Sequence, residues 1–376
     1  MTSPEKLLRE LIALPSVNPA FAPANDPHAG EQSVADFLAA ISAQVGLPVE
    51  FQKISPGRSN FLTRLQPSGK ITKRILLAPH LDTVPAANES QFSPVKRNGR
   101  IYGRGACDTK GSVASMLCAL LSIANHSQRP KHTEIIFAGL IDEEDGQRGS
   151  RALVARGLKA DLAIVGEPTE LKIVTAHKGS LWLRLQTHGK AAHGSTPQFG
   201  KNAVHEMARV VNLLETTYAA QLRKRRHPLL GHATISVGTI AGGTQANVVP
   251  DQCVISADRR TLPGETETSV RREIQQLLRA KKISATIDDS KSAPCLSMET
   301  NIKSTLVQDF LRTLGQKKAL GVDYFCDAAV LSQKGIPSVV FGPGNIAQAH
   351  TSDEWISVSQ LEQATRMLVN FFQTLP

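Results

Sequence analysis

The sequence of 376 residues predicts an α/β protein into which a second, smaller α+β domain is inserted. Three observations support this fold class. Apolar residues follow alternating helix and strand patterns up to residue 177, a two-residue period begins at residue 178, and the α/β pattern resumes after residue 290. A chain of this length also exceeds what one hydrophobic core normally supports, which favours two domains.

The first α/β part opens with an amphipathic helix. Ser3 and Pro4 are typical of a helix cap and a first helical position, and leucine and isoleucine recur at helical spacing over 7–12. The same criteria predict further helices over 34–41, 111–124 and 149–155. Strands are expected over 49–54, 61–65, 75–78, 134–140 and 162–165.

The inserted part, 178–290, reads as a strand-helix-strand-strand-helix-strand unit of the ferredoxin-like type. Leucine occupies every second position over 181–185, as expected for a sheet with one exposed face. Further strands are expected over 233–240, 253–259 and 283–287, and helices over 202–217 and 268–280.

The main domain is therefore expected to comprise 1–177 and 291–376. Its second part should contain a helix over 302–314 and a strand over 337–341. Ser357 and Gln360 have the spacing of a capping box that opens the last helix.

Composition excludes several classes of protein. The apolar runs are too short to cross a membrane and no signal peptide is recognisable, so a soluble, cytoplasmic protein without membrane contact is expected. Five scattered cysteines, none in a Cys-x-x-Cys pair, argue against a disulfide framework and a thiolate zinc cluster. A metal ion would therefore need histidine and carboxylate ligands.

The net charge of +10 raises the question of nucleic-acid binding. The densest basic run, Arg223 to His227, has no interleaved aromatic residues and no accompanying nucleic-acid motif. We interpret it as a solvated helix end and expect no nucleic-acid partner. Attraction of a small substrate that carries a carboxylate explains part of the charge.

A histidine and an aspartate follow the apolar run 75–78. His80 has the character of a metal ligand, and Asp82, two residues on, can fix the other ring N–H of that histidine. Taken alone, such a pair is also compatible with a structural histidine at a strand end.

Polar residues past other strand ends extend this pair. They are Asp108 in a glycine-rich turn, the acidic triplet Asp142, Glu143 and Glu144, then Glu167, and His350 beyond the strand that ends at Phe341. Each has an alternative interpretation as a turn, loop or surface residue. Their joint placement favours a two-metal site, because ligand sites of α/β sheets gather at the carboxyl ends of strands. Ligands without thiolates favour zinc, with cobalt or manganese as substitutes in vitro.

Several segments together resemble a known enzyme family along essentially the whole chain. They are HLDTVP at 80–85, GRGACDTKG at 103–111, DEE at 142–144, GEP at 166–168 and AH at 349–350. The chain is similar in these motifs to the co-catalytic zinc aminoacylases and carboxypeptidases, which include acetylornithine deacetylases and succinyl-diaminopimelate desuccinylases. The resemblance implies a zinc-peptidase-like catalytic domain with a central mixed sheet flanked by helices, and an inserted lid and dimerisation domain.

The resemblance also implies roles for the residues and two zinc ions per chain. Asp108 would bridge the two metals. His80 and Glu167 would complete one metal site, Glu144 and His350 the other, with Glu143 as general base and Asp82 orienting His80. Two adjacent glutamates suit this division of labour, because a metal-bound carboxylate is unavailable for proton transfer.

The insert carries three further residues that match motifs of the family. His193 would reach over the site of the partner subunit and stabilise the oxyanion, which implies a homodimer. Asn247 and Arg260 match substrate-holding positions, and Arg260 is suited to a carboxylate clamp. Arg259 beside it leaves open which arginine reaches the substrate, since neighbouring strand residues face opposite ways.

The segments 342–354 and 325–328 resemble acetylornithine and acetylcitrulline deacetylases more than desuccinylases. We therefore expect a deacetylase of amino-acid biosynthesis, in the arginine pathway, that removes acetyl from the α-nitrogen of an amino acid such as N-acetylornithine or N-acetylcitrulline. Thr261 stands at a position where those enzymes commonly have proline. The sequence therefore does not decide whether the substrate is a derivative of ornithine, citrulline or another amino acid. A desuccinylase, a metallocarboxypeptidase and a non-catalytic binding protein are the alternatives.

Overall fold

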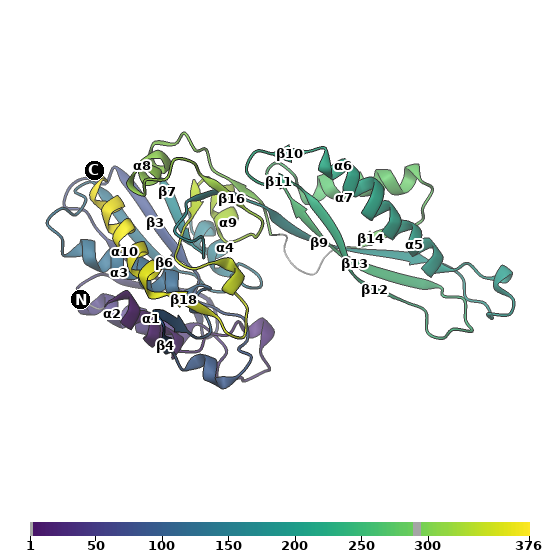
Figure 1. The fold of residues 1–376 in the computed structure, drawn as a ribbon, viewed down its shortest axis with the longest axis horizontal. Coiled ribbons are helices and arrows are strands. Elements are labelled where there is room, and N and C mark those ends of the chain that lie inside the picture. Colours follow the sequence, from purple (N-terminus) through teal and green to yellow (C-terminus); the bar gives the residue numbers. More distant parts are fainter. Residues whose placement is uncertain (1–2, 289–294) are drawn as a thin grey trace. The chain divides into compact units, whose positions relative to one another are not determined.

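The computed structural model describes residues 3–288 and 295–376. The chain divides into two compact units (Figure 1). Unit 1 comprises Met1–Thr175, Glu299–Leu320 and Cys326–Pro376, and unit 2 comprises Ala176–Met298 and Gly321–Phe325. The expected insert was 178–290, and its expected end lies outside the described residues. The short return segment 321–325 of unit 2 was not expected.

A nine-stranded mixed sheet forms the centre of unit 1. Its order is β1-β2-β6-β3-β7-β17-β8-β15, with β16 paired to β8. The bounds are β1 Val49–Ser55, β2 Arg58–Leu65, β3 Lys73–Pro79, β6 Thr133–Gly139, β7 Leu162–Gly166, β8 Val174–His177, β15 Met298–Glu299, β16 Leu320–Val322 and β17 Ser338–Val340. The strands β6, β3, β7 and β17 run parallel, whereas the pairs β1–β2, β2–β6 and β17–β8 are antiparallel. The expected mixed sheet is thus confirmed.

Helices cover both faces of this sheet (Figure 1). Their bounds are α1 Pro4–Ile12, α2 Gln32–Gln44, α3 Lys110–Ala124, α4 Arg148–Ala155, α8 Thr305–Thr313, α9 Ala328–Gln333 and α10 Val358–Gln373. On one face α3 packs on β3 and β6, and α1 and α10 pack on α3, while α9 packs on β17, β7 and α4. Ile75 and Leu77 of β3 enter the large apolar core that includes α1, α3 and α10. Leu76 and Ala78 on the other face are buried as well, and this burial on both faces explains the continuous apolar run in the sequence.

A small three-stranded sheet lies beside the start of α10. It contains β4 Val95–Arg97, β5 Arg100–Tyr102 and β18 Trp355–Ser357 in the order β18-β5-β4. Ser357 caps α10 by accepting the N–H of Gln360, as expected. A capping box also requires the side chain of Gln360 to accept the N–H of Ser357. That part of the prediction is wrong, because the side chain of Gln360 accepts the N–H of Gly344.

Unit 2 is a four-stranded antiparallel sheet with helices on one face. The order is β12-β13-β9-β14, with β9 Gly179–His188, β12 Thr234–Gly242, β13 Gln252–Thr261 and β14 Thr286–Asp288. Its core combines alternate residues of β9, such as Leu181 and Leu183, with residues of α5 Ala203–Asn212 and α7 Glu267–Ala280. Trp182, between those leucines, is 63% exposed, so the predicted alternation is confirmed.

The helix expected over 202–217 is divided in the structure. After α5 the chain continues as a π-helical segment, Leu213–Tyr218, and as α6 Ala219–Arg223. The basic run 223–227 follows at an exposed helix end and includes the short strand β10 Arg226–His227, which pairs with β11 Gly231–His232. None of the five cysteines, all of which lie among the described residues, forms a disulfide bond. Within residues 3–288 and 295–376, none of the helices has the length and apolarity needed to cross a membrane.

Candidate metal centre

Three parallel strands of unit 1 end at the candidate site. His80 directly follows β3, Glu167 directly follows β7, and Glu143 and Glu144 lie in the loop between β6 and α4. The pairs β3–β6 and β3–β7 are parallel, so their carboxyl ends meet at one edge of the sheet. The topology therefore brings together residues that are up to 87 positions apart in sequence, as the strand-end argument predicts.

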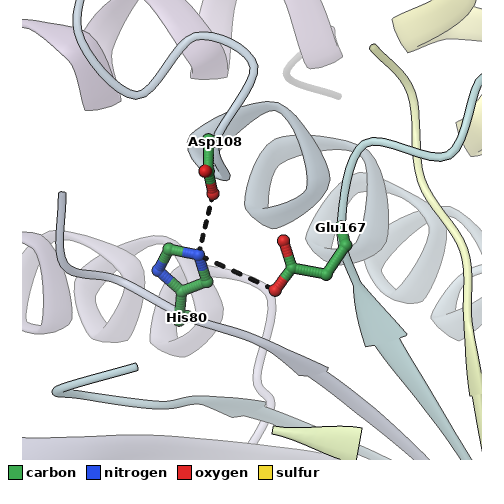
Figure 2. A group of neighbouring side chains, drawn as sticks. All are labelled: His80, Asp108 and Glu167. Carbon is green, nitrogen blue, oxygen red and sulfur yellow. Dashed lines mark hydrogen bonds and ion pairs between the residues drawn. The ribbon is translucent and has the colours of Figure 1, made fainter. Parts of the chain in front are cut away.

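His80, Asp108 and Glu167 form a buried group of potential ligands (Figure 2). The Nε2 atom of His80 lies 3.0 Å from Oδ1 of Asp108 and 3.8 Å from Oε1 of Glu167. The side chain of His80 is only 1% exposed. Asp108 reaches this group from the turn before α3, and its backbone immediately precedes the helix cap Thr109.

Asp108 also belongs to a second group, with Glu144 and His350. The Nε2 atom of His350 lies 3.3 Å from Oδ2 of Asp108 and 3.2 Å from Oε2 of Glu144. Each oxygen of Asp108 thus faces one histidine, which is the arrangement that a bridging carboxylate needs. His350 has a left-handed backbone (φ 62°) and lies beyond the short 3₁₀ helix Ile346–Gln348, so it is more distant from the end of β17 than the sequence suggested.

The chemistry of these groups fits metal ions. Oε1 of Glu144 and Oε1 of Glu167 are buried, and neither accepts a hydrogen bond from the part of the chain that the structure describes. Buried carboxylate oxygens without partners are costly, and a divalent cation in each group would satisfy them. Both groups offer only imidazole and carboxylate donors, a set that zinc accepts.

The pKa directions reflect an excess of negative charge. Burial raises the pKa of Glu167 well above its usual range, and the charge of Asp108 adds to the effect. Burial and Asp108 likewise raise the pKa of Glu144. Hydrogen bonds with Asp108 and Glu144 raise the pKa of His350 to about 10. Burial opposes ionisation of Asp108, but hydrogen bonds from His350 and His80 lower its pKa.

Glu143 belongs to neither group, but it interacts electrostatically with Glu167 and His80 of the first and with Glu144 of the second. Its residue is 8% exposed, and burial together with the charge of Glu167 raises its pKa well above the usual range. A carboxyl group with a raised pKa near a reaction centre is suited to accept and return a proton. Of the two adjacent glutamates, Glu144 belongs to a ligand group and Glu143 does not.

Asp82 makes a broader set of contacts than the sequence indicated. Its Oδ1 lies 3.4 Å from Nδ1 of His80, whereas the backbone carbonyl of Asp82 lies closer, at 3.0 Å. The carbonyl is therefore the better acceptor for the ring N–H. The carboxylate accepts the backbone N–H groups of Glu143 (3.0 Å) and Glu144 (3.1 Å), so Asp82 also fixes the loop that carries them.

Glu354 supports the site and was missed by sequence reasoning. One of its oxygens accepts the N–H groups of Cys107 (2.8 Å) and Asp108 (2.9 Å). The other accepts the N–H of Gly105 (2.9 Å) and a hydrogen bond from Arg104 (2.7 Å). This buried carboxylate thus holds the whole glycine-rich turn. A turn with so many free N–H groups needs an acceptor, which is the signal that could have pointed to Glu354.

The predicted residues of the insert belong to unit 2, and the two ligand groups belong to unit 1. His193 is exposed, and its Nδ1 lies 2.6 Å from the hydroxyl of Ser195. The carbonyl of Asn247 accepts the N–H of Gly194, which connects the two motifs. His193 and Asn247 are both exposed.

The two neighbouring arginines of β13 differ in their surroundings. Arg259 is fully buried, donates to Glu265 and to the hydroxyl of Tyr218, and serves the interior of unit 2. Arg260 has a 32% exposed side chain, pairs with Asp258 at 2.8 Å and lies over the ring of Phe325. Arg260 is therefore the arginine of the pair that remains available for a carboxylate.

Comparison with protein families identifies the chain as a relative of known hydrolases. Residues 76–374 match the model of peptidase family M20/M25/M40. The chain is 31% identical over 363 residues to acetylornithine deacetylase of Edwardsiella ictaluri, which covers 93% of this chain and 92% of the relative. It is also 31% identical to acetylornithine deacetylase of Yersinia pseudotuberculosis, with 97% and 95% coverage.

Solved structures agree in fold at low sequence identity. A tripeptidase from Staphylococcus aureus aligns with a TM-score of 0.77 at 22% identity and covers 98% of this chain and 97% of its own. An M20 metallo-carboxypeptidase from Sulfolobus solfataricus aligns with a TM-score of 0.77 at 19% identity, covering 99% of each chain. A dinuclear metal-binding M20 peptidase from Bacillus subtilis has a TM-score of 0.73 at 14% identity, covering 98% and 96%. The chain therefore belongs to peptidase family M20/M25/M40 and is a metal-dependent hydrolase.

Proposed function

We propose that this chain is a di-zinc amidohydrolase that removes a short acyl group, acetyl in the first instance, from the α-nitrogen of an amino acid. N-acetylornithine and N-acetylcitrulline are the proposed substrates, and the proposed setting is arginine biosynthesis in the cytoplasm. The observation that carries the proposal is a buried Glu143 beside two ligand groups that share Asp108. The naming of relatives about 30% identical as acetylornithine deacetylases supports the choice of substrate.

The residues of the two groups would hold the metal ions. His80 and Glu167 would bind one zinc ion, Glu144 and His350 the other, and Asp108 both. Zinc bound there would lower the pKa of a water molecule and polarise the carbonyl of the scissile amide. Cobalt or manganese would serve as substitutes in vitro.

Glu143 would carry the proton through the reaction. Its carboxylate takes a proton from the attacking water as the new carbon–oxygen bond forms. The same carboxyl group then gives the proton to the nitrogen of the leaving amino acid as the carbon–nitrogen bond breaks. A buried side chain with a raised pKa suits both steps, because it neither holds the proton too weakly nor exchanges it freely with solvent.

Residues of unit 2 would bind the substrate and complete the site. Arg260 is proposed to hold the α-carboxylate, in exchange for its present partner Asp258, and Asn247 to contact the acyl amide. His193 would come from the partner subunit of a homodimer and stabilise the oxyanion. The exposure of His193 and the partial exposure of Arg260 support these roles.

A carboxypeptidase or desuccinylase is the second candidate function. The observation in its favour is the similarity in fold to a structure described as an M20 metallo-carboxypeptidase. Both candidate activities cleave an amide beside a carboxylate, so the same clamp and metal centre would serve either.

The substrate is tested with a panel assayed on zinc-loaded protein. N-acetylornithine, N-acetylcitrulline, N-acetylmethionine, N-succinyl-diaminopimelate and a set of dipeptides are compared by kcat/KM. The proposal expects the N-acetyl amino acids to be preferred by at least about tenfold, which is about 1.4 kcal/mol of transition-state binding. A preference for the succinyl or dipeptide substrates would replace it with the second candidate.

Replacement of Glu143 by glutamine tests the mechanism. Glu143→Gln keeps the volume and removes the proton acceptor, so kcat should fall by about 10²–10⁴ while zinc content stays near two per chain. Asp145→Asn, at an exposed acidic neighbour in the same loop, is the matched control and should keep full activity. Activity of Glu143→Gln within tenfold of wild type would contradict the role of the base.

A further inference from the structure

Asn18 lies in the loop after α1, and its side chain is completely buried. Its backbone N–H donates to the carbonyl of Thr83 at 2.8 Å, which attaches the loop to the chain just beyond Asp82. Its Oδ1 atom accepts the N–H of Ala20 at 3.0 Å. Because the oxygen of the amide is already bound in this way, the orientation of the amide is fixed and its NH₂ group faces the interior.

The NH₂ group of Asn18 contacts two carboxylates. It donates to Oδ2 of Asp82 at 2.8 Å and to Oδ1 of Asp142 at 3.1 Å. Asp82 in turn accepts the backbone N–H groups of Glu143 and Glu144. The amide of Asn18 thus connects Asp82 with Asp142, the residue immediately before Glu143.

The backbone at this point has an uncommon conformation. Asp142 is left-handed (φ 68°), a region that residues with a side chain seldom adopt, although aspartate adopts it more readily than most. Without the donor between them, the carboxylates of Asp82 and Asp142 would face each other with like charge. The amide of Asn18 donates a hydrogen bond to one oxygen of each carboxylate and so reduces the repulsion between them.

A separate set of ion pairs holds the same loop to the fold. Arg58 donates to Glu31 at 2.7 Å and to Asp142 at 3.0 Å, and Arg148 donates to Asp142 at 2.7 Å. Glu31 also accepts the N–H of Asp142 at 3.2 Å. These contacts do not involve Asn18, so the loop should remain folded when the amide is removed. What Asn18 adds is the connection to Asp82.

We infer that Asn18 is a positioning residue of this hydrolase. Its amide fixes Asp82 against the loop 142–144, and through Asp82 it sets the positions of the base Glu143, the ligand Glu144 and the ring of His80. The inference rests on the proposed function for the role of Glu143. It concerns the metal centre independently of the substrate, because His80 and Glu144 belong to the two ligand groups.

The test compares two variants at Asn18 with a control in the same loop. Asn18→Ala removes the donor, and Asn18→Asp keeps the volume but places a third carboxylate against Asp82 and Asp142. Ser16→Ala is the control: the Ser16 hydroxyl is equally buried and donates to the carbonyl of Leu81 at 2.7 Å, but it does not contact Asp82. It removes a buried hydrogen bond between the same two segments.

Two readouts are measured, and one of them needs no substrate. For Asn18→Ala we expect kcat to fall about 10–100-fold with KM changed less than about threefold, and zinc affinity in chelator competition to fall about tenfold. Asn18→Asp should lose more of both. Ser16→Ala should lower thermal stability but leave kcat and zinc affinity within about threefold of wild type.

The outcomes separate this inference from the proposed function. If wild type fails to hydrolyse the N-acetyl substrates, the proposed function is wrong, while the zinc competition still decides the role of Asn18. If Asn18→Ala matches Ser16→Ala in both kcat and zinc affinity, Asn18 is only structural. Loss of the folded protein in both Asn18 variants would also overturn the inference, because the ion pairs around Arg58 are expected to maintain the loop.

Discussion

The two ligand groups share Asp108 but differ in exposure. In the group with Glu167, the histidine side chain is 1% exposed and follows a central strand of the sheet. In the group with Glu144, the side chain of His350 is 53% exposed and comes from an irregular segment between a 3₁₀ helix and β18. One half of the centre is therefore part of the core, and the other half lies at the surface of unit 1.

This difference indicates separate tasks for the two halves. The side chains of His80 and Glu167 are almost completely buried, so a metal ion held there would have little contact with solvent. The side chain of His350 is half exposed, so its group is open to solvent. We therefore expect the buried half to dominate stability and metal retention, and the exposed half to exchange its metal more readily.

The largest loss of zinc and activity is expected from a substitution that removes a ligand from both groups. Asp108→Ala removes the ligand that faces both histidines, at 3.0 Å from His80 and 3.3 Å from His350. Zinc content measured by atomic emission should fall from about two per chain to less than about 0.5, and kcat should fall more than about 10³-fold. A variant that retains two zinc ions would show that Asp108 does not bridge.

A pair of histidine variants tests the asymmetry directly. His80→Ala should lower the melting temperature of the zinc-loaded protein by more than about 5 °C, because it opens a cavity and leaves buried carboxylates uncompensated. His350→Ala should change it by less than about 2 °C and leave about one zinc ion per chain, because the residue is half exposed. Equal effects in the two variants would contradict the division into buried and exposed halves.

The elements that the sequence predicted well are those with a long apolar period. α1, α3 and β3 lie within one or two residues of their expected ranges, and β9 contains the expected alternation over 181–185, because each presents several buried residues at a regular spacing. Strands of two to four residues, such as β8, β15 and β16, carry no such period and were not expected. The six-residue helix α9 was missed for the same reason.

Site residues were predictable where chemistry and topology coincide. His80 and Glu167 follow apolar strands directly and Glu144 lies in the loop after a third, so their position already indicated a ligand role. Glu354 and Asn18 act through contacts more than 60 positions away in the sequence, and no local pattern marks them. The arrangement of Arg259 and Arg260 followed from strand alternation, but only burial decided which of them is accessible.

A moderate loss of zinc affinity is expected when Glu354, which accepts the backbone N–H of Asp108, is replaced. Glu354→Gln replaces one acceptor oxygen by a donor that faces backbone N–H groups or Arg104. Zinc affinity in both halves should fall together, by about 10–100-fold in chelator competition, since the turn carries Asp108. Asp353→Asn, at the exposed neighbouring residue, is the control and should leave zinc affinity unchanged. Weaker zinc binding in only one half would mean that Glu354 does not act through Asp108.

The smallest predicted effect is on the pH dependence of stability and concerns a second buried histidine, His177. This residue shows that burial alone does not make a histidine a metal ligand. His177 in unit 2 is as buried as His80, but its Nδ1 donates to the carbonyl of Lys178 and it belongs to neither ligand group. Whereas carboxylates raise the pKa of His80, burial lowers the pKa of His177 to about 4.

The sign of the resulting pH dependence follows from this lowered pKa. The unfolded chain binds a proton at His177 below about pH 6.5, and the folded chain does so only below about pH 4. Stability should therefore be fully present above pH 6.5 and decrease as the pH falls toward 4, by about 2 kcal/mol at pH 5. His177→Gln should remove this part of the decrease in a comparison of urea midpoints at pH 7 and pH 5. If the variant and wild type lose equal stability between these pH values, His177 is not held neutral by the fold, and the contrast with His80 would rest on geometry alone.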